Sequence, residues 1–189
     1  DQVGNIEVAD ATLVAGTLTN NGTFTVSGES TLKIANLSGD ADITDAELQD
    51  GSYITNGDGT IYFNGSNAID GAVTIGSEIY NYGKLDVKDG ATFTNQSGKI
   101  TYLVGTGASL NVAENATVKV NDLWNNVQGS AVSTIDGTAE ISHNAWLRNA
   151  TINGSLSIEN QLAVYSNDAF NVNGELTING NGSPAGWLI

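Results

Sequence analysis

Residues that could catalyse a reaction are sparse in this chain of 189 residues. It contains no cysteine, a single histidine, His143, and a single arginine, Arg148. Hydrolysis of a polysaccharide needs a pair or trio of carboxylates at a suitable separation, and elimination by a uronate lyase needs an Arg or Lys base beside calcium-binding acids. Neither set of motifs is visible, and His143 is expected to be an outward polar residue. The sequence therefore predicts a protein without enzymatic activity, catalytic residues or cofactor.

Aromatic residues set among amides indicate binding instead. An exposed indole beside amide side chains can stack on a sugar ring while the amides bond its hydroxyl groups. Trp124 is followed in this way by Asn125 and Asn126, and Tyr80 and Tyr82 form a similar mixed patch. We predict that these residues bind a ligand. The alternative is that Trp124 folds back as a plug over the protein interior.

The charge of the chain restricts its partners. Its 21 acidic and 6 basic side chains give a net charge of -15. Nucleic-acid recognition needs clustered Lys and Arg, so a nucleic-acid partner is excluded and any other polyanion is disfavoured. The longest apolar run, at residues 162–165, is far shorter than the roughly 20 residues of a membrane-spanning helix. We therefore expect no membrane insertion by this segment.

A dense acidic cluster raises the question of a metal site. Five acidic residues fall within eleven positions: Asp40, Asp42, Asp45, Glu47 and Asp50. Calcium prefers carboxylate oxygens, but the spacings of the EF-hand and of the glycine-rich nonapeptide repeat are absent. Turn formation and surface solvation account for the cluster without a metal, and no metal site is predicted.

The elements that position these residues are short strands. Apolar residues alternate with polar ones, as in Thr23-Phe24-Thr25-Val26, and helical spacing is not sustained anywhere. Pairs such as Asn153-Gly154 recur along the chain. Because Asn, Asp and Gly tolerate the left-handed backbone conformation of tight turns, these pairs predict turns between the strands.

A repeat organises these strands. Two apolar residues separated by one position are followed, six positions after the second, by a third apolar residue. Seven copies show the pattern: Ile6/Val8/Val14, Phe24/Val26/Leu32, Ile61/Phe63/Ile69, Leu85/Val87/Phe93, Leu110/Val112/Val118, Ala139/Ile141/Leu147 and Leu156/Ile158/Val164. With two degenerate copies, at Ala41 and Leu176, successive copies begin 17 to 29 residues apart.

Units of this length cannot bury their own apolar faces, whereas stacked units share a continuous interior. We therefore predict an all-β fold, a parallel β-helix (β-solenoid) of about nine rungs of 17–29 residues that forms a single segment over residues 1–189. Trp146 is expected in the interior. One column should contain Val26, Phe63, Val87 and Val112. An antiparallel sandwich is the alternative, but it does not explain the fixed six-residue step.

The outward residue of each unit gives a second predicted surface. In rung order these residues are Glu7, Thr25, Asp42, Tyr62, Asp86, Asn111, Glu140, Ser157 and Thr177. Acidic and neutral residues alternate through the first eight, which would keep carboxylates off adjacent rungs, where they would lie about 5 Å apart. We predict an acidic face of Glu7, Asp42, Asp86 and Glu140 that attracts cations or a basic partner. A solvated surface with chance alternation is the alternative.

Several phrases of the sequence resemble the passenger regions of bacterial autotransporter adhesins and related large surface proteins. They are residues 18–26 (LTNNGTFTV), 90–95 (GATFTN) and 173–180 (NGELTING). The resemblance implies a right-handed parallel β-helix, part of a longer protein and displayed outside a Gram-negative cell. It also implies attachment to host glycans or matrix, or clumping between cells.

These observations predict a segment of an extracellular or cell-surface adhesin. Its lateral faces would contact a host glycan or surface protein, or other copies of itself, through many weak contacts along a rigid surface. A β-helical polysaccharide lyase or hydrolase is one alternative and would show carboxylates converging within about 5 to 10 Å. A structural stalk without a ligand is the other.

Overall fold

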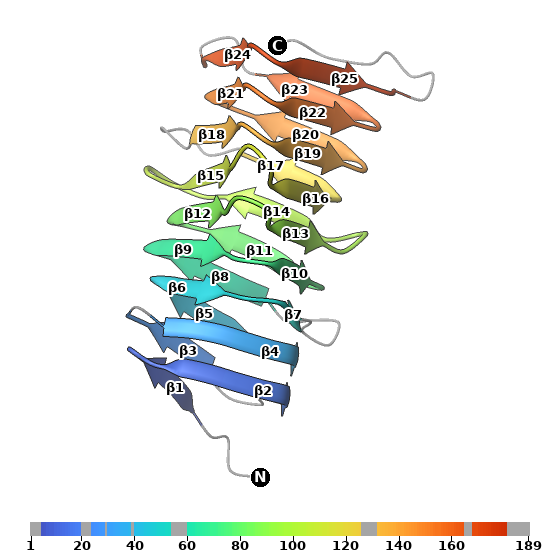
Figure 1. The fold of residues 1–189 in the computed structure, drawn as a ribbon. Coiled ribbons are helices and arrows are strands. Elements are labelled where there is room, and N and C mark those ends of the chain that lie inside the picture. Colours follow the sequence, from blue (N-terminus) through green and yellow to red (C-terminus); the bar gives the residue numbers. More distant parts are fainter. Residues whose placement is uncertain are drawn as a thin grey trace.

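The chain forms a column of stacked coils with strands on three sides (Figure 1). The computed structural model describes residues 5–19, 24–28, 30–38, 40–53, 60–125, 132–164 and 168–180. These residues form 25 strands and no helix, and therefore no helix that could cross a membrane. Neighbouring strands pair in parallel, as β1 does with β3 and β2 with β4. The prediction of an all-β parallel β-solenoid is confirmed.

The strands belong to three sheets, here named A, B and C. Sheet A contains β1 (Ile6–Ala9), β3 (Phe24–Ser27), β5 (Ala41–Thr44), β8 (Thr60–Asn64), β11 (Glu78–Asn81), β14 (Ile100–Leu103), β17 (Asp122–Trp124), β20 (Asn144–Leu147) and β23 (Gln161–Val164). Sheet B contains β2 (Thr12–Thr19), β4 (Ser30–Ser38), β6 (Ala46–Leu48), β9 (Ser66–Ile69), β12 (Lys84–Val87), β15 (Ser109–Val112), β18 (Val132–Ile135), β21 (Ala150–Ile152) and β24 (Phe170–Val172). Sheet C contains β7 (Gly51–Tyr53), β10 (Ala72–Ile75), β13 (Thr92–Asn95), β16 (Thr117–Val120), β19 (Thr138–Ile141), β22 (Ser155–Ile158) and β25 (Glu175–Ile178).

The column has about seven full turns, fewer than the nine expected rungs, because sheet C has seven strands where sheets A and B have nine. In the two N-terminal coils, the long strands β2 and β4 replace the two short strands of later coils. Strand β4 also packs against β7 of sheet C. The two N-terminal coils therefore have one continuous strand where later coils turn a corner between sheets B and C.

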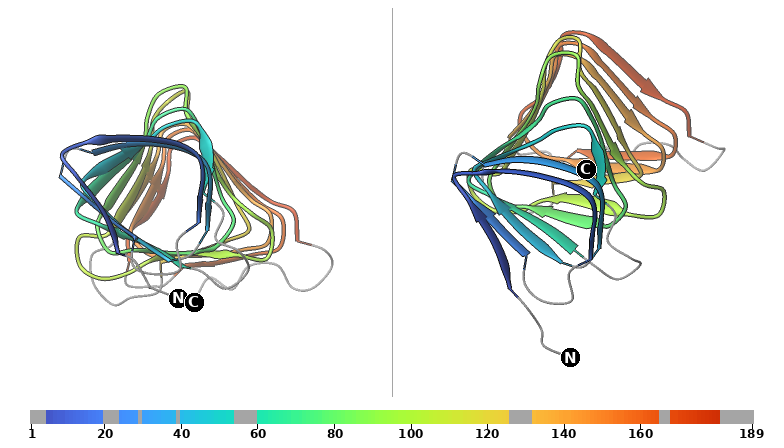
Figure 2. Two further views of the ribbon diagram at one scale, coloured as in Figure 1. Left: turned by 90° about the horizontal axis from the view of Figure 1, so that it is seen from below. Right: turned by 60° about the horizontal axis from the view of Figure 1, so that its bottom comes forward.

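The interior is built from the apolar half of each alternating strand. Viewed along the column, the three sheets enclose this interior (Figure 2). Phe24, Phe63 and Phe93 are completely buried there. Because alternate residues of a strand point to opposite faces, the intervening residues face solvent. The same alternation that predicted strands thus assigns every strand an inner and an outer set of side chains.

The coils are more uniform in length than expected. Equivalent positions in sheet A are Ile6, Phe24, Ala41, Ile61, Ile79, Thr101, Leu123, Ala145 and Leu162, so one coil takes 17 to 22 residues. The expected upper length of 29 residues is wrong. The reason is that all three sheets use the same apolar-any-apolar pattern, so units from different sheets were taken as equivalent.

The predicted single column of apolar residues is wrong for the same reason. Val26 and Phe63 share an inward column of sheet A, in which Ile43 lies between them. Val87 and Val112 are paired in sheet B instead. The interior therefore contains several parallel columns, and the stacking of coils does not depend on the one that was predicted.

Carboxylates of the acidic cluster hold corners of the coils. Asp40 Oδ1 accepts from the N–H of Thr60 at 2.7 Å. Asp45 Oδ1 accepts from the N–H of Ser66, and Asp50 Oδ1 accepts from the next coil in the same way, each at 2.6 Å. Three of the five clustered acids are thus occupied with backbone donors of the following coil, as turn formation predicts.

Another corner is held by stacked amide and glycine residues. The Nδ2 of Asn153 donates to Asp136 Oδ1 at 2.6 Å, and the Nδ2 of Asn173 donates to Asn153 Oδ1 at 2.8 Å. A Cβ atom on Gly154 would lie 2.0 Å from the carbonyl oxygen of Gly137 in the coil before it. Backbone of adjacent coils approaches too closely here for any side chain, which explains the recurring Asx-Gly pairs.

Candidate binding face

A row of aromatic side chains runs along the outer side of sheet A. The strand register pairs five outward residues in succession: Tyr62, Tyr80, Tyr102, Trp124 and Trp146. They come from β8, β11, β14, β17 and β20, so each of five adjacent coils contributes one ring. We call this set the aromatic row. At the strand spacing of about 4.8 Å it extends over about 20 Å.

The rings of the aromatic row contact one another. Ring centroids are 5.8 Å apart for Tyr62 and Tyr80 and 4.6 Å apart for Tyr80 and Tyr102, and both pairs are stacked. Trp124 and Trp146 stack at 4.0 Å. Between these groups, Tyr102 and Trp124 meet edge to face at 5.6 Å with an interplanar angle of 80°. The row is thus two stacks joined at a step where the ring orientation changes.

The row is only partly covered, and this has an electrostatic consequence. All five rings are half-buried. Burial, and then the nearby carboxylate of Glu78, raises the pKa of both Tyr80 and Tyr102 above the ordinary phenol value of about 10. These hydroxyl groups therefore stay protonated near neutral pH, where each can donate and accept a hydrogen bond.

The predicted ligand-binding residues are placed unequally. Trp124 and Tyr80 lie in the aromatic row, and Trp124 faces outward rather than forming an interior plug. Tyr82 lies just beyond β11 and is 45% exposed. Asn126 lies outside the described residues.

Asn125 and Trp146 correct the predictions in opposite directions. Asn125 is fully buried, and its Nδ2 donates to the carbonyl oxygen of Arg148 at 2.7 Å, so this side chain does not face a ligand. Trp146 was expected in the interior but faces outward against Trp124. Alternation explains both results, because the residue after an outward position points inward.

The predicted acidic face does not exist as one surface. Glu7 and Asp42 are both outward on sheet A, two coils apart, with Thr25 between them. Asp86 lies on β12 of sheet B, and Glu140 lies on β19 of sheet C. The prediction is wrong because it followed one apolar pattern across three sheets.

A buried carboxylate lies beside the aromatic row at the edge of sheet A. Asp122, whose side chain is 9% exposed, contacts His143 Nδ1 through Oδ1 at 2.9 Å and accepts from the N–H of Asn144 at 3.0 Å. The imidazole is half-exposed, in agreement with the outward position expected for His143. Ser142, the neighbouring hydroxyl, donates to Asn121 Oδ1 at 3.4 Å, so it is not held against the imidazole as a nucleophile would be.

Sequence reasoning missed Tyr62 and Tyr102 as members of the binding surface. The five residues of the row follow each other at intervals of 18, 22, 22 and 22 positions. These intervals equal the lengths of the coils between them. A search for aromatic residues at about one coil length would have found the whole row.

The described residues contain no group of three or more His, Cys, Asp or Glu side chains arranged to hold a metal ion. Comparisons of the chain with protein-family models, with curated proteins and with solved structures find no match.

Proposed function

We propose that this chain is a binding segment of a bacterial surface adhesin, without enzymatic activity, and that it binds a linear uncharged glycan along sheet A. The observation that carries the proposal is the aromatic row, which places five ring systems in line on one outer face. Aromatic side chains with polar tips are well suited to contact sugars, because one end is apolar and the other forms hydrogen bonds.

The shape of the row favours a linear ligand. It is one side chain wide and about 20 Å long. A stable protein partner needs about 800 Å² of contact on each side, and a single file of five half-buried rings supplies far less. An extended chain of sugar units could instead contact one ring per coil, so that weak contacts add along the row.

The charge of the protein favours an uncharged ligand. A net charge of -15 repels sulfated, sialylated or uronic-acid glycans, particularly at low ionic strength. The row itself contributes neutral hydroxyl and indole groups. The absence of enzymatic activity is supported by the positions of the acidic residues Asp42, Asp86 and Glu140, which lie on three different sheets.

A glycan array tests this proposal. The chain should bind linear uncharged glycans, and a Tyr80→Ala/Tyr102→Ala variant should bind them at least about tenfold more weakly, a loss of about 1.4 kcal/mol. The matched control is Thr74→Ala/Thr94→Ala, which removes two paired outward side chains from sheet C. Equal binding by both variants would contradict the proposal, as would the absence of any glycan signal.

A structural stalk is the second candidate, and the ring geometry favours it. Stacking at 4.0 to 5.8 Å covers ring faces with neighbouring rings, which stabilises the sheet whether or not a ligand is present. For a stalk, the Tyr80→Ala/Tyr102→Ala variant should lower the thermal unfolding temperature while neither protein binds a glycan. A concentration-dependent dimer in analytical ultracentrifugation would indicate self-association instead.

A further inference from the structure

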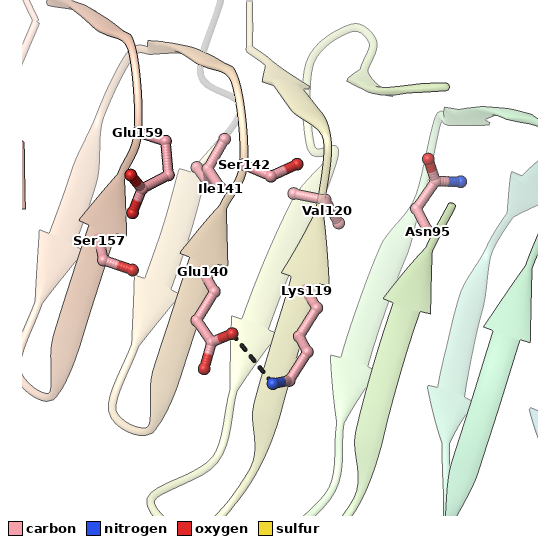
Figure 3. A pocket seen from close by; sticks show the side chains of 8 residues that line it. All are labelled: Asn95, Lys119, Val120, Glu140, Ile141, Ser142, Ser157 and Glu159. Carbon is pink, nitrogen blue, oxygen red and sulfur yellow. Dashed lines mark ion pairs between the residues drawn. The ribbon is translucent and has the colours of Figure 1, made fainter. Parts of the chain in front are cut away.

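Sheet C contains a pocket that the aromatic row does not reach. Its volume is about 400 Å³, and its lining includes Asn95, Lys119, Glu140, Ser142, Ser157 and Glu159. These residues lie in or just after four successive strands, β13, β16, β19 and β22 (Figure 3). The volume is in the lower part of the range for small-molecule sites and many times that of one water molecule.

The pocket lies where two coils separate. The register between β13 and β16 ends at Thr94 and Lys119, whereas the register between β16 and β19 continues to Val120 and Ile141. In the next coil the residue after the strand, Ser142, donates its N–H to the carbonyl oxygen of Val120 at 2.9 Å.

Among the residues that the structure describes, the equivalent bond from the N–H of Asn121 to the carbonyl oxygen of Asn95 is not made. The opening therefore leaves one backbone donor and one backbone acceptor without the partners that they have in neighbouring coils. Backbone polar groups away from bulk water are normally satisfied by protein, water or ligand.

Asn95 adds a second unused acceptor at the same place. It occupies an inward position next to Ile75 and is 3% exposed. Its Nδ2 donates to the carbonyl oxygen of Ser77 at 2.8 Å, while its Oδ1 is buried and has no hydrogen-bond partner within the described part of the chain. An acceptor in such a position needs a donor, because burial without a hydrogen bond costs free energy.

The lining as a whole has an excess of acceptors and of negative charge. Lys119 Nζ is paired with Glu140 at 3.0 Å, as the dashed line in Figure 3 marks. Glu159 accepts from Asn179 through Oε1 at 3.0 Å, which leaves its other oxygen for a ligand. One ammonium and two carboxylates give the lining a net charge of about -1 at neutral pH.

We propose that this pocket binds a small hydroxylated primary amine, of the size of one amino sugar. The ammonium group would pair with Glu159, and the hydroxyl groups would donate to the unused acceptors of Asn95. Ser142 and Ser157 can accept or donate at the remaining hydroxyl groups. This inference does not depend on the aromatic row, because the two sites lie on different sheets and take different probes.

The test is a titration of the ¹⁵N-labelled chain with D-glucosamine, followed by nuclear magnetic resonance. Amide shifts should concentrate at Asn95, Ser142 and Glu159, and D-glucose should bind at least about tenfold more weakly, since it lacks the charge. Equal affinity for both sugars would overturn the role of the amine. Shifts that avoid the pocket would overturn the site and indicate that only water fills it.

Variants separate the site from general charge effects. Glu159→Gln should weaken D-glucosamine binding about tenfold while keeping an oxygen for Asn179. The matched control is Glu175→Gln, an exposed carboxylate on the neighbouring strand β25, which should leave binding unchanged. Unchanged binding by Glu159→Gln would overturn the proposal.

Two further variants complete the design. Asn95→Leu should abolish binding by removing the acceptor and filling the opening with an apolar side chain. If it does not fold, the Glu159→Gln comparison still decides the question. The Tyr80→Ala/Tyr102→Ala variant should retain D-glucosamine binding, so a failure of this proposal can be told apart from a failure of the glycan proposal.

Discussion

The outer faces of sheets A and C are built on the same backbone but carry opposite chemistry. Sheet A presents the aromatic row, with rings in mutual contact over five coils. At the equivalent outward position, sheet C presents Thr74, Thr94, Lys119, Glu140, Ser157 and Thr177. Both faces have apolar columns behind them. The scaffold therefore does not dictate its surface, and binding chemistry depends on which outward residues the coils carry.

The inner sides of the two sheets should respond alike to truncation. Phe63 in sheet A and Phe93 in sheet C are both completely buried. We expect Phe63→Ala and Phe93→Ala each to reduce the free energy of unfolding by about 3 to 5 kcal/mol, because each leaves a cavity. Chemical denaturation would measure both. A large difference between them would show that the sheets differ inside as well as outside.

The outer sides should respond differently. Trp146→Ala removes a ring stacked at 4.0 Å on Trp124 and should cost about 1 to 2 kcal/mol. Ser157→Ala, on the outer face of sheet C, should change stability by less than about 0.5 kcal/mol. Loss of the exciton signal of the paired indoles in circular dichroism would confirm that the stack was broken. Equal effects of the two substitutions would remove the contrast between the faces.

Alkaline pH should weaken sheet A selectively. Burial raises the pKa of Tyr80 and of Tyr102, so the folded state holds these protons more tightly than the unfolded chain. The stability from this difference is fully present below the unfolded pKa of about 10 and is lost as pH rises through the folded pKa values. Denaturation at several alkaline pH values would measure the decline.

Tyr80→Phe/Tyr102→Phe is the control for this prediction, because it keeps both rings and removes both ionisable groups. The variant should show a smaller alkaline decline, and tyrosinate absorbance should lose the components that titrate latest. An identical decline in both proteins would show that other groups govern alkaline unfolding.

The smallest effect is expected from the ion pair on sheet C. Lys119 and Glu140 lie 3.0 Å apart, with side chains 49% and 47% exposed. Solvent screening limits such a pair to at most about 1 kcal/mol. Lys119→Gln should therefore change stability slightly at low salt and not measurably at high salt. A salt-independent loss would indicate that Lys119 stabilises sheet C by packing rather than by charge.

Much of the architecture was predictable from local pattern. Alternation around residues such as Phe24 and Val26 is visible in the sequence, and the turns at Asn153-Gly154 are marked by their residue types. The outward position of Trp124 followed from its polar neighbours. The assignment of units to sheets was not predictable in this way, because Ile61 and Leu85 open identical patterns yet lie in sheets A and B.

The candidate site was predictable only in part for the same reason. Tyr80 and Trp124 were identified singly, whereas their alignment with Tyr62 and Tyr102 depends on coil length, which the sequence pattern had overestimated. The burial of Asn125 was missed, because an amide next to an indole looks like a ligand contact until the direction of its side chain is known.

By itself, the sequence determined that the chain folds as stacked parallel strands, since period-2 alternation and repeated tight turns are properties of neighbouring residues. Only the tertiary structure decided which side chains share a face. That depends on the summed length of every strand and corner in a coil, and a difference of a few residues moves a side chain to another sheet. The aromatic row on sheet A and the opening between coils on sheet C exist at that level alone.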